Sequence, residues 1–146
     1  MASVGSAVLS VTNIGGGTGA LRCAIAWTAD GSGNVSGNLL ALPPGLIMLV
    51  NFVPGTAANL YDVDLLNAGG ASCFDDGTGA SIGANLANTS TVRRVPFING
   101  TTGATNTYAR SWLAGSHGVG SYQLTVSGAG AGASGTVIIY LTPSGV

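Results

Sequence analysis

Residues 122–141 read YQLTVSGAGAGASGTVIIYL, and this stretch decides the fold class. Over residues 122–127, apolar side chains alternate with polar ones. A period of two is typical of a β-strand and not of a helix. A glycine- and alanine-rich connection at 128–135 then leads to a nearly continuous apolar run at 137–141. We predict a β-hairpin whose second strand is buried on both faces.

The same alternation recurs in short runs along the chain, separated by segments rich in Gly, Asn, Ser and Pro. The further predicted strands cover residues 6–12, 21–28, 45–53, 60–66 and 91–98. Residues 67–88 contain few apolar anchors and predict a long loop, and residues 99–106 predict a turn-rich tip. Nothing in the 146 residues marks a second domain. We therefore expect an all-β protein, a single β-sandwich or jelly-roll-like domain over residues 1–146 with short strands and long glycine-rich loops.

The charged residues are few and of two kinds only. The chain has no lysine and no glutamate, so its charges are four arginines and five aspartates, 6% of all residues, against about 25% in ordinary domains. A formal net charge of -1 offers no basic stripe for phosphates, and we expect no nucleic-acid binding. The longest apolar stretch, residues 39–53, is interrupted by prolines and Asn51, so we expect no membrane span.

Several segments look like ligand-binding motifs but lack a necessary residue. The glycines at 15–19 are not followed by the lysine of a phosphate-binding loop. Those at 128–132 precede a strand, where a dinucleotide-binding loop would open a helix. The segment that begins at Asp30 lacks the glycine and the glutamate of a calcium loop, and Asp75 and Asp76 have no third carboxylate nearby. We predict neither a cofactor nor a metal.

The two cysteines, Cys23 and Cys73, are too few for a disulfide framework. The N-terminus has no basic residues ahead of its apolar ones, so we do not expect a secretory signal. Proteins that stay in the cytosol keep their thiols reduced. We expect both cysteines to be reduced, small, buried hydrophobic residues.

Asp62 and Asp64 are the candidates for enzymatic chemistry. They lie two residues apart on one face of a predicted strand, about 7 Å along the backbone, a separation that also occurs between paired glycosidase carboxylates. The other interpretation, which we favour, is that these aspartates pair with arginines. His117 lies in a predicted loop and acts as a base only if the fold brings a nucleophile and an orienting acid to it. We expect the protein not to be an enzyme.

An apolar excess with so few charges leaves the protein little to keep its surface solvated. We expect another chain to cover part of that surface. In a homo-oligomer, symmetric contacts would hide the apolar patches, and arginines would form pairs with aspartates of a neighbouring copy. The arginines are Arg22, Arg93, Arg94 and Arg110.

Four segments together resemble a family of small β-rich virion proteins of tailed bacteriophages. They are NLYDVDLLNAGG at 59–70, IGAN at 82–85, YQLTVSGAG at 122–130 and SGTVIIYL at 134–141. In that family a YDV-x-L strand is followed by a Gly-Ala-Asn segment and a hairpin with the L-x-V-x-G-A-G and SG-x-V-x-x-Y patterns. The resemblance covers about the C-terminal two thirds of the chain. It implies a structural part of the virus particle, made in the host cytoplasm.

The function expected from this resemblance is that of a capsid decoration, or cement, protein on the capsid surface. As a homo-oligomer, expected to be a trimer, it would bridge neighbouring subunits of the major capsid protein. We expect residues 1–13 to form an N-terminal arm or strand that contacts a partner by pairing with an exposed strand edge. The candidate interface residues are Ser6, Val8, Ser10, Thr12, Arg93, Arg94 and Arg110.

Two other functions remain open. In the first, the protein is a phage tail or head-fibre component, and the loops at 67–88 and 99–117 meet a host receptor. In the second, it is an enzyme that acts on polysaccharide through Asp62, Asp64 or His117.

Overall fold

A computed structural model of the chain describes residues 4–102, 105–110, 112–113 and 122–142. Strands make up 52% of the structure, and all their pairings are antiparallel. Among the described residues, the one helical segment is a short 3-10 turn, η1 (Gly16–Thr18). The chain is an all-β protein, as predicted, and its arrangement is consistent with a β-sandwich.

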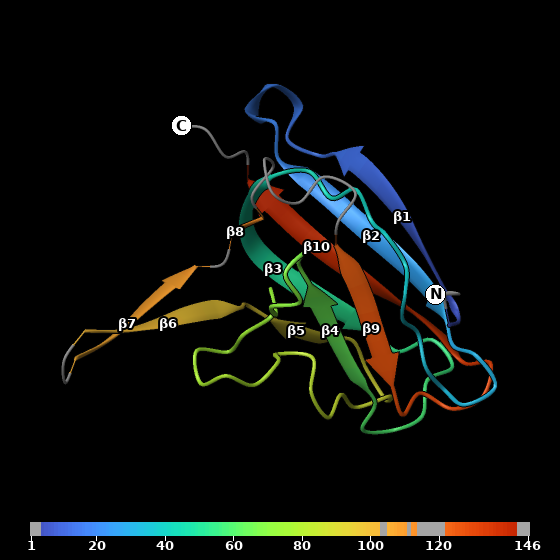
Figure 1. The fold of residues 1–146 in the computed structure, drawn as a ribbon. Helices are drawn as coiled ribbons and strands as arrows, with labels where there is room; N and C mark the ends of the chain where they lie inside the picture. The colour runs from blue at the N-terminus through green and yellow to red at the C-terminus, as the bar shows by residue number, and fades with distance from the viewer. Residues whose placement is uncertain (1–3, 103–104, 111, 114–121, 143–146) are drawn as a thin grey trace.

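The larger layer, here called the main sheet, contains five strands that lie side by side (Figure 1). Their order across the sheet is β1 (Ser6–Asn13), β2 (Leu21–Thr28), β10 (Ser134–Thr142), β3 (Gly45–Val53) and β5 (Val92–Arg94). A short strand, β8 (Trp112–Leu113), pairs with the beginning of β3. The last strand in the described residues, β10, is therefore the centre of the sheet, and β1 and β5 are its two edges.

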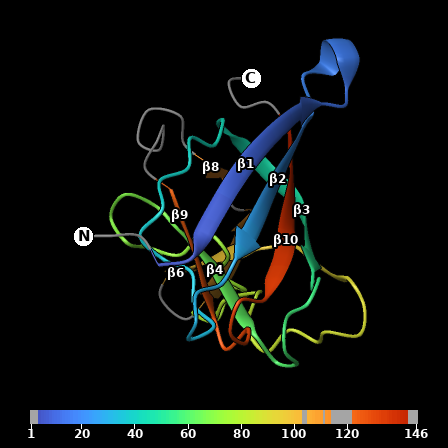
Figure 2. The same cartoon turned by 90° about the vertical axis from the view of Figure 1, so that its right-hand side faces the viewer.

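The second layer, here called the second sheet, is formed by β4 (Asp62–Leu66) and β9 (Gln123–Ser127). Single bridges at Val35 and Leu40 add a further segment beside β9. Figure 2 views the main sheet nearly edge-on and shows β4 and β9 on one side of it. Within the described residues, no second layer of strands covers the other side of the main sheet.

A separate hairpin projects away from the two layers (Figure 1). Its strands are β6 (Phe97–Thr102) and β7 (Thr105–Arg110), which pair with each other as a two-stranded sheet. A single parallel bridge joins Phe97 to Asp76 of the loop at 67–88. The sequence predicted a turn-rich tip over 99–106, and most of that segment is instead strand. The predicted strand at 91–98 is broken into β5 and β6 because Pro96 cannot donate a ladder hydrogen bond.

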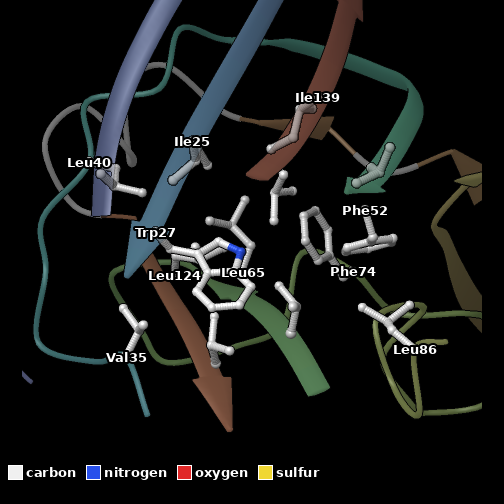
Figure 3. Packing of buried hydrophobic residues seen from close by; sticks show 14 of the residues in the cluster. Ile25, Trp27, Val35, Leu40, Phe52, Leu65, Phe74, Leu86, Leu124 and Ile139 are labelled. Carbon is white, nitrogen blue, oxygen red and sulfur yellow. The ribbon is translucent and has the colours of Figure 1, made fainter. Parts of the chain in front are cut away.

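The hydrophobic core lies between the two sheets (Figure 3). The main sheet contributes fully buried side chains from alternate positions of its central strands, such as Ile25, Phe52 and Ile139. The loop at 67–88 contributes Phe74, whose ring meets that of Phe52 edge-on with centroids 5.7 Å apart. The loop contains no strand, as predicted, and its apolar anchors are buried. These anchors are Phe74, Ile82 and Leu86.

The prediction of a hairpin from residues 122–141 is wrong. The strand β9 pairs with β4 in the second sheet, and β10 lies between β2 and β3 in the main sheet. The connection at 128–133 therefore crosses from one layer to the other. The prediction that the second strand is buried on both faces is also wrong, because β10 alternates: Val137 and Ile139 are buried, whereas Ile138 and Tyr140 are half-buried.

Candidate functional site

The candidate surface is the outer face of the main sheet, defined by the side chains that point away from the second sheet. The pairing registers place on it Ser6, Val8, Ser10, Thr12, Arg22, Ala24, Ala26, Thr28, Leu49, Asn51, Val53, Arg93, Thr136, Ile138 and Tyr140. Five of the seven interface residues proposed from the sequence therefore lie on one face of the sheet, four on β1 and one on β5 at the opposite edge. They are Ser6, Val8, Ser10, Thr12 and Arg93.

One row of cross-strand neighbours shows how the fold places residues from distant parts of the sequence on one face. Adjacent strands hold directly opposite side chains on the same face of a sheet, at about 5 Å between Cβ atoms. The row runs across all five strands and consists of Ser10, Ala24, Ile138, Asn51 and Arg93. A residue of the N-terminal strand and an arginine 83 positions later thus belong to one surface.

The outer face has small, neutral and apolar side chains, with Val8 63% exposed. Its charged residues are Arg22 and Arg93, and it has no carboxylate. The aspartates lie in loops or on the second sheet: Asp30, Asp62, Asp64, Asp75 and Asp76. The face therefore combines apolar area with cations and suits a partner surface that is apolar or carries carboxylates.

The other two proposed interface residues are placed differently. Arg94 follows Arg93 in β5 but pairs with Val50, a buried residue, so its side chain leaves the strand on the opposite face. Its guanidinium Nη1 donates a hydrogen bond to the carbonyl oxygen of Ile82 at 2.8 Å. Arg94 therefore fixes the loop at 67–88 to the sheet edge. Arg110 is described by its backbone only, which pairs with Phe97.

The segment at 1–13 was expected to be an arm or strand that contacts a partner. From Ser6 onwards it is a full strand of the main sheet, paired with β2 from Ser6 opposite Thr28 to Asn13 opposite Leu21. Ala7 and Leu9 pack against the core from this strand. The segment is therefore an integral edge strand of the sandwich.

Asp62 and Asp64 lie on one face of β4, as predicted, beside a pocket of about 250 Å³. The Asp62 carboxylate accepts a hydrogen bond from the backbone N–H of Asn85 at 2.7 Å. That of Asp64 accepts from the Ser72 hydroxyl at 2.6 Å and from the N–H of Leu65 at 2.9 Å. Within the described part of the chain their partners are these groups, and not the arginines expected from the sequence. The two carboxylates hold the loop at 67–88 against the second sheet.

The described ranges contain no group of three or more His, Cys, Asp or Glu side chains that are placed to hold a metal ion. They also contain no helix of the length and hydropathy needed to cross a bilayer. The candidate base His117 lies outside the described residues.

The two thiols are free and shielded. Cys23 is fully buried, as expected, and burial raises its pKa to about 11. Cys73 is half-buried, and burial together with the nearby Asp64 carboxylate raises its pKa to about 12. Since the thiolate is the reactive form, both thiols are poor nucleophiles near neutral pH.

Comparison with protein-family models, curated proteins and solved structures finds no match to this chain.

The outer face of the main sheet depends on which strands pair, and reasoning from the sequence missed most of its residues. The signal that points to it is the uncharged residue at nearly every second position of β1, β2, β3 and β10, with small residues most frequent in β1 and β2. Examples are Ala24 and Ala26 in β2 and Thr136 in β10.

Proposed function

We propose that this chain is a structural virion protein that decorates the capsid of a tailed bacteriophage. In this proposal the outer face of the main sheet contacts the major capsid protein, and the protein stabilises the shell by surface contact without chemistry. The proposal also includes self-association of the chain. It rests on the ordered resemblance of four sequence segments to β-rich virion proteins and on one structural observation.

That observation is the composition of the outer face. A sheet face that only meets water normally carries charged side chains between its strands. The outer face has two arginines at its ends and a neutral centre, where Ala24 and Ile138 are only half-buried. A decoration protein contacts the shell at many equivalent positions, so each contact needs only modest affinity. A face with a neutral centre and two arginines suits such a contact.

The test is binding of the purified chain to capsids that lack it. We expect Ala26→Asp, an exposed position on the outer face, to reduce the number of copies per capsid at least about tenfold, because an uncompensated charge is then desolvated in the contact. Ala131→Asp, exposed in the connection at 128–133, is the matched control and should bind like the unaltered chain. Equal binding of both variants would overturn the assignment of this face.

A second candidate function is host attachment as part of a tail or head fibre. The observation that favours it is the projecting hairpin of β6 and β7, because receptor-binding segments often extend from a rigid scaffold. Immunogold labelling of intact particles separates the two. Label spread over the heads supports decoration, whereas label confined to a tail or to one vertex supports attachment. Particles without label would remove both.

A further inference from the structure

The outward edge of β1 is open. In the described part of the chain, β2 is the one strand that pairs with β1. The ladder between them continues at Ile14, whose N–H donates to the carbonyl of Ala20 at 2.9 Å. Backbone groups of a strand point alternately to its two sides. The even-numbered residues of β1 therefore bond to β2, and the odd-numbered residues turn their N–H and C=O groups outward.

The opposite side of β2 supports the same assignment. The N–H of Ala29 donates to the carbonyl of Ala133 at 2.7 Å, so the odd-numbered residues of β2 face β10. The even-numbered residues of β2 then face β1, where each meets an even-numbered residue. Four residues of β1 are left with outward backbone groups: Ala7, Leu9, Val11 and Asn13.

This edge lacks the features by which natural sheets avoid edge-to-edge contact. Such features are prolines, bulges, very short strands and charged side chains, above all lysine. The strand β1 has eight residues in unbroken register with β2, and it contains no proline and no charge. Two of its apolar side chains are exposed, Val8 at 63% and Val11 at 47%. An edge of this kind is a template for another strand.

We propose that a second copy of this chain pairs with it edge to edge, β1 against β1, across a two-fold axis at Ser10. The two strands run antiparallel, as a two-fold axis perpendicular to the sheet requires. Of the registers that bring outward backbone groups opposite each other, this one uses all four outward residues. Leu9 then pairs with Val11 of the partner, and Ala7 pairs with Asn13 of the partner.

The side chains agree with this register on both faces. Val11 stands on the core side of β1, opposite the fully buried Cys23, and yet remains 47% exposed because the strand is the sheet edge. In the dimer it packs against Leu9 of the partner. On the outer face, Val8 pairs with Thr12 of the partner, and Ser10 meets its own equivalent.

Charge favours a second copy as the occupant. Because β1 has no charged residue, two copies approach without like charges opposite each other, which would oppose pairing. A strand from another protein would meet no charged side chain on β1 that could make its binding specific. An eight-residue edge is small beside a standard interface, so we expect a weak dimer in solution that forms a continuous ten-stranded sheet from two five-stranded ones. This pairing yields a dimer, and not the trimer expected from the sequence.

Cross-linking tests the register directly. Directly opposite residues that are not hydrogen-bonded have Cα atoms about 4.5 Å apart, which suits a disulfide. We expect Ser10→Cys to give a disulfide-linked dimer under mild oxidation of the purified chain. Thr12→Cys is the matched control, because the two Thr12 positions lie about 13 Å apart in this register. The buried Cys23 and half-buried Cys73 give the background, measured in the unaltered chain.

The proposal is overturned if Ser10→Cys forms the disulfide-linked dimer no faster than Thr12→Cys. A second pair of variants separates loss of pairing from loss of fold. Val11→Pro removes an outward N–H without touching the ladder to β2, whereas Val11→Thr keeps that N–H. In the Ser10→Cys background we expect Val11→Pro to slow cross-linking at least about tenfold with an unchanged circular dichroism spectrum, and Val11→Thr to retain it. Unslowed cross-linking with Val11→Pro would refute the backbone pairing. Since these experiments use the purified chain alone, their outcome does not depend on the virion proposal.

Discussion

The two faces of the main sheet are formed by the same five strands, but they have different side chains. Along β10, Val137 and Ile139 point inward and are fully buried, whereas Thr136 and Ile138 point outward and stay half-buried. The inner face contains the bulky residues, including Trp27 and Phe52. The outer face contains mainly Ala, Ser, Thr and Val.

This difference shows that the two faces meet different demands. The inner face must fill the space to the second sheet at the density of a protein interior. No such layer covers the outer face in the described part of the chain, and many of its side chains are small. Folding therefore depends on the inner face, while the outer face and the β1 edge are available for contacts with other chains.

The largest expected effect comes from emptying part of the inner face. Phe52 is fully buried and meets Phe74 edge-on. We expect Phe52→Ala to lower the free energy of unfolding by about 3–5 kcal/mol, because the lost contacts leave a cavity. Urea denaturation measures this value. Ile138→Ala, on the outer face of β10, is the comparison and should cost clearly less. Equal losses would mean that the two faces contribute alike to folding.

Overpacking the inner face should have a smaller effect. A Cβ added at Gly135 would overlap the Cζ2 atom of Trp27 and would lie 2.8 Å from the carbonyl oxygen of Val53. We expect Gly135→Ala to destabilise the fold by about 1–3 kcal/mol, because the indole must shift within a packed core. Thermal unfolding is the measurement. Gly31→Ala, where an added Cβ meets nothing within 4 Å, should unfold close to the unaltered chain, and a shift as large as that of Gly135→Ala would contradict the steric reason.

Side-chain alternation identified most of the strands because it depends only on which neighbours face the core. Pairing partners could not be predicted in this way. The strands β9 (Gln123–Ser127) and β10 (Ser134–Thr142) are adjacent in sequence and show the same alternation. Neither sequence indicates that β9 pairs with β4 or that β10 lies between β2 and β3. The connection between them is long enough for a hairpin and also for a crossing between layers.

The candidate site was predictable to a similar extent. Alternation placed Ser6, Val8, Ser10 and Thr12 on one face from the sequence alone. That Ser10 and Arg93 belong to the same face depends on four successive strand registers, which no local pattern encodes. The hydrogen bonds of Asp62 and Asp64 depend on how the loop at 67–88 folds back, which is likewise a long-range property.

The next smaller effect is expected in the second sheet, where the side chain of Asn38 forms hydrogen bonds with the backbone of β9. The Asn38 amide nitrogen donates to the carbonyl of Leu124, and its amide oxygen accepts from the N–H of Leu124, both at 2.8 Å. We expect Asn38→Ala to cost about 1–2 kcal/mol, because two part-buried backbone groups lose their partner. Hydrogen exchange at the Leu124 amide should speed up with it. Unchanged protection of that amide would show that water replaces the side chain without loss.

The smallest effect is expected in the loops, where much of the negative charge lies. The exposed Asp76 carboxylate accepts hydrogen bonds from the hydroxyl and the backbone N–H of Thr78, at 2.6 and 2.8 Å, and these bonds lower its pKa. A lowered pKa in the folded state stabilises the protein above the unfolded pKa, and this contribution is lost as the pH falls through the folded value. We expect Thr78→Val to raise the pKa of Asp76 in an NMR titration, with Thr89→Val as the control that leaves it unchanged. Because the side chain is in water, stability against acid should hardly change; a clear loss would mean that this loop supports the core more than its exposure implies.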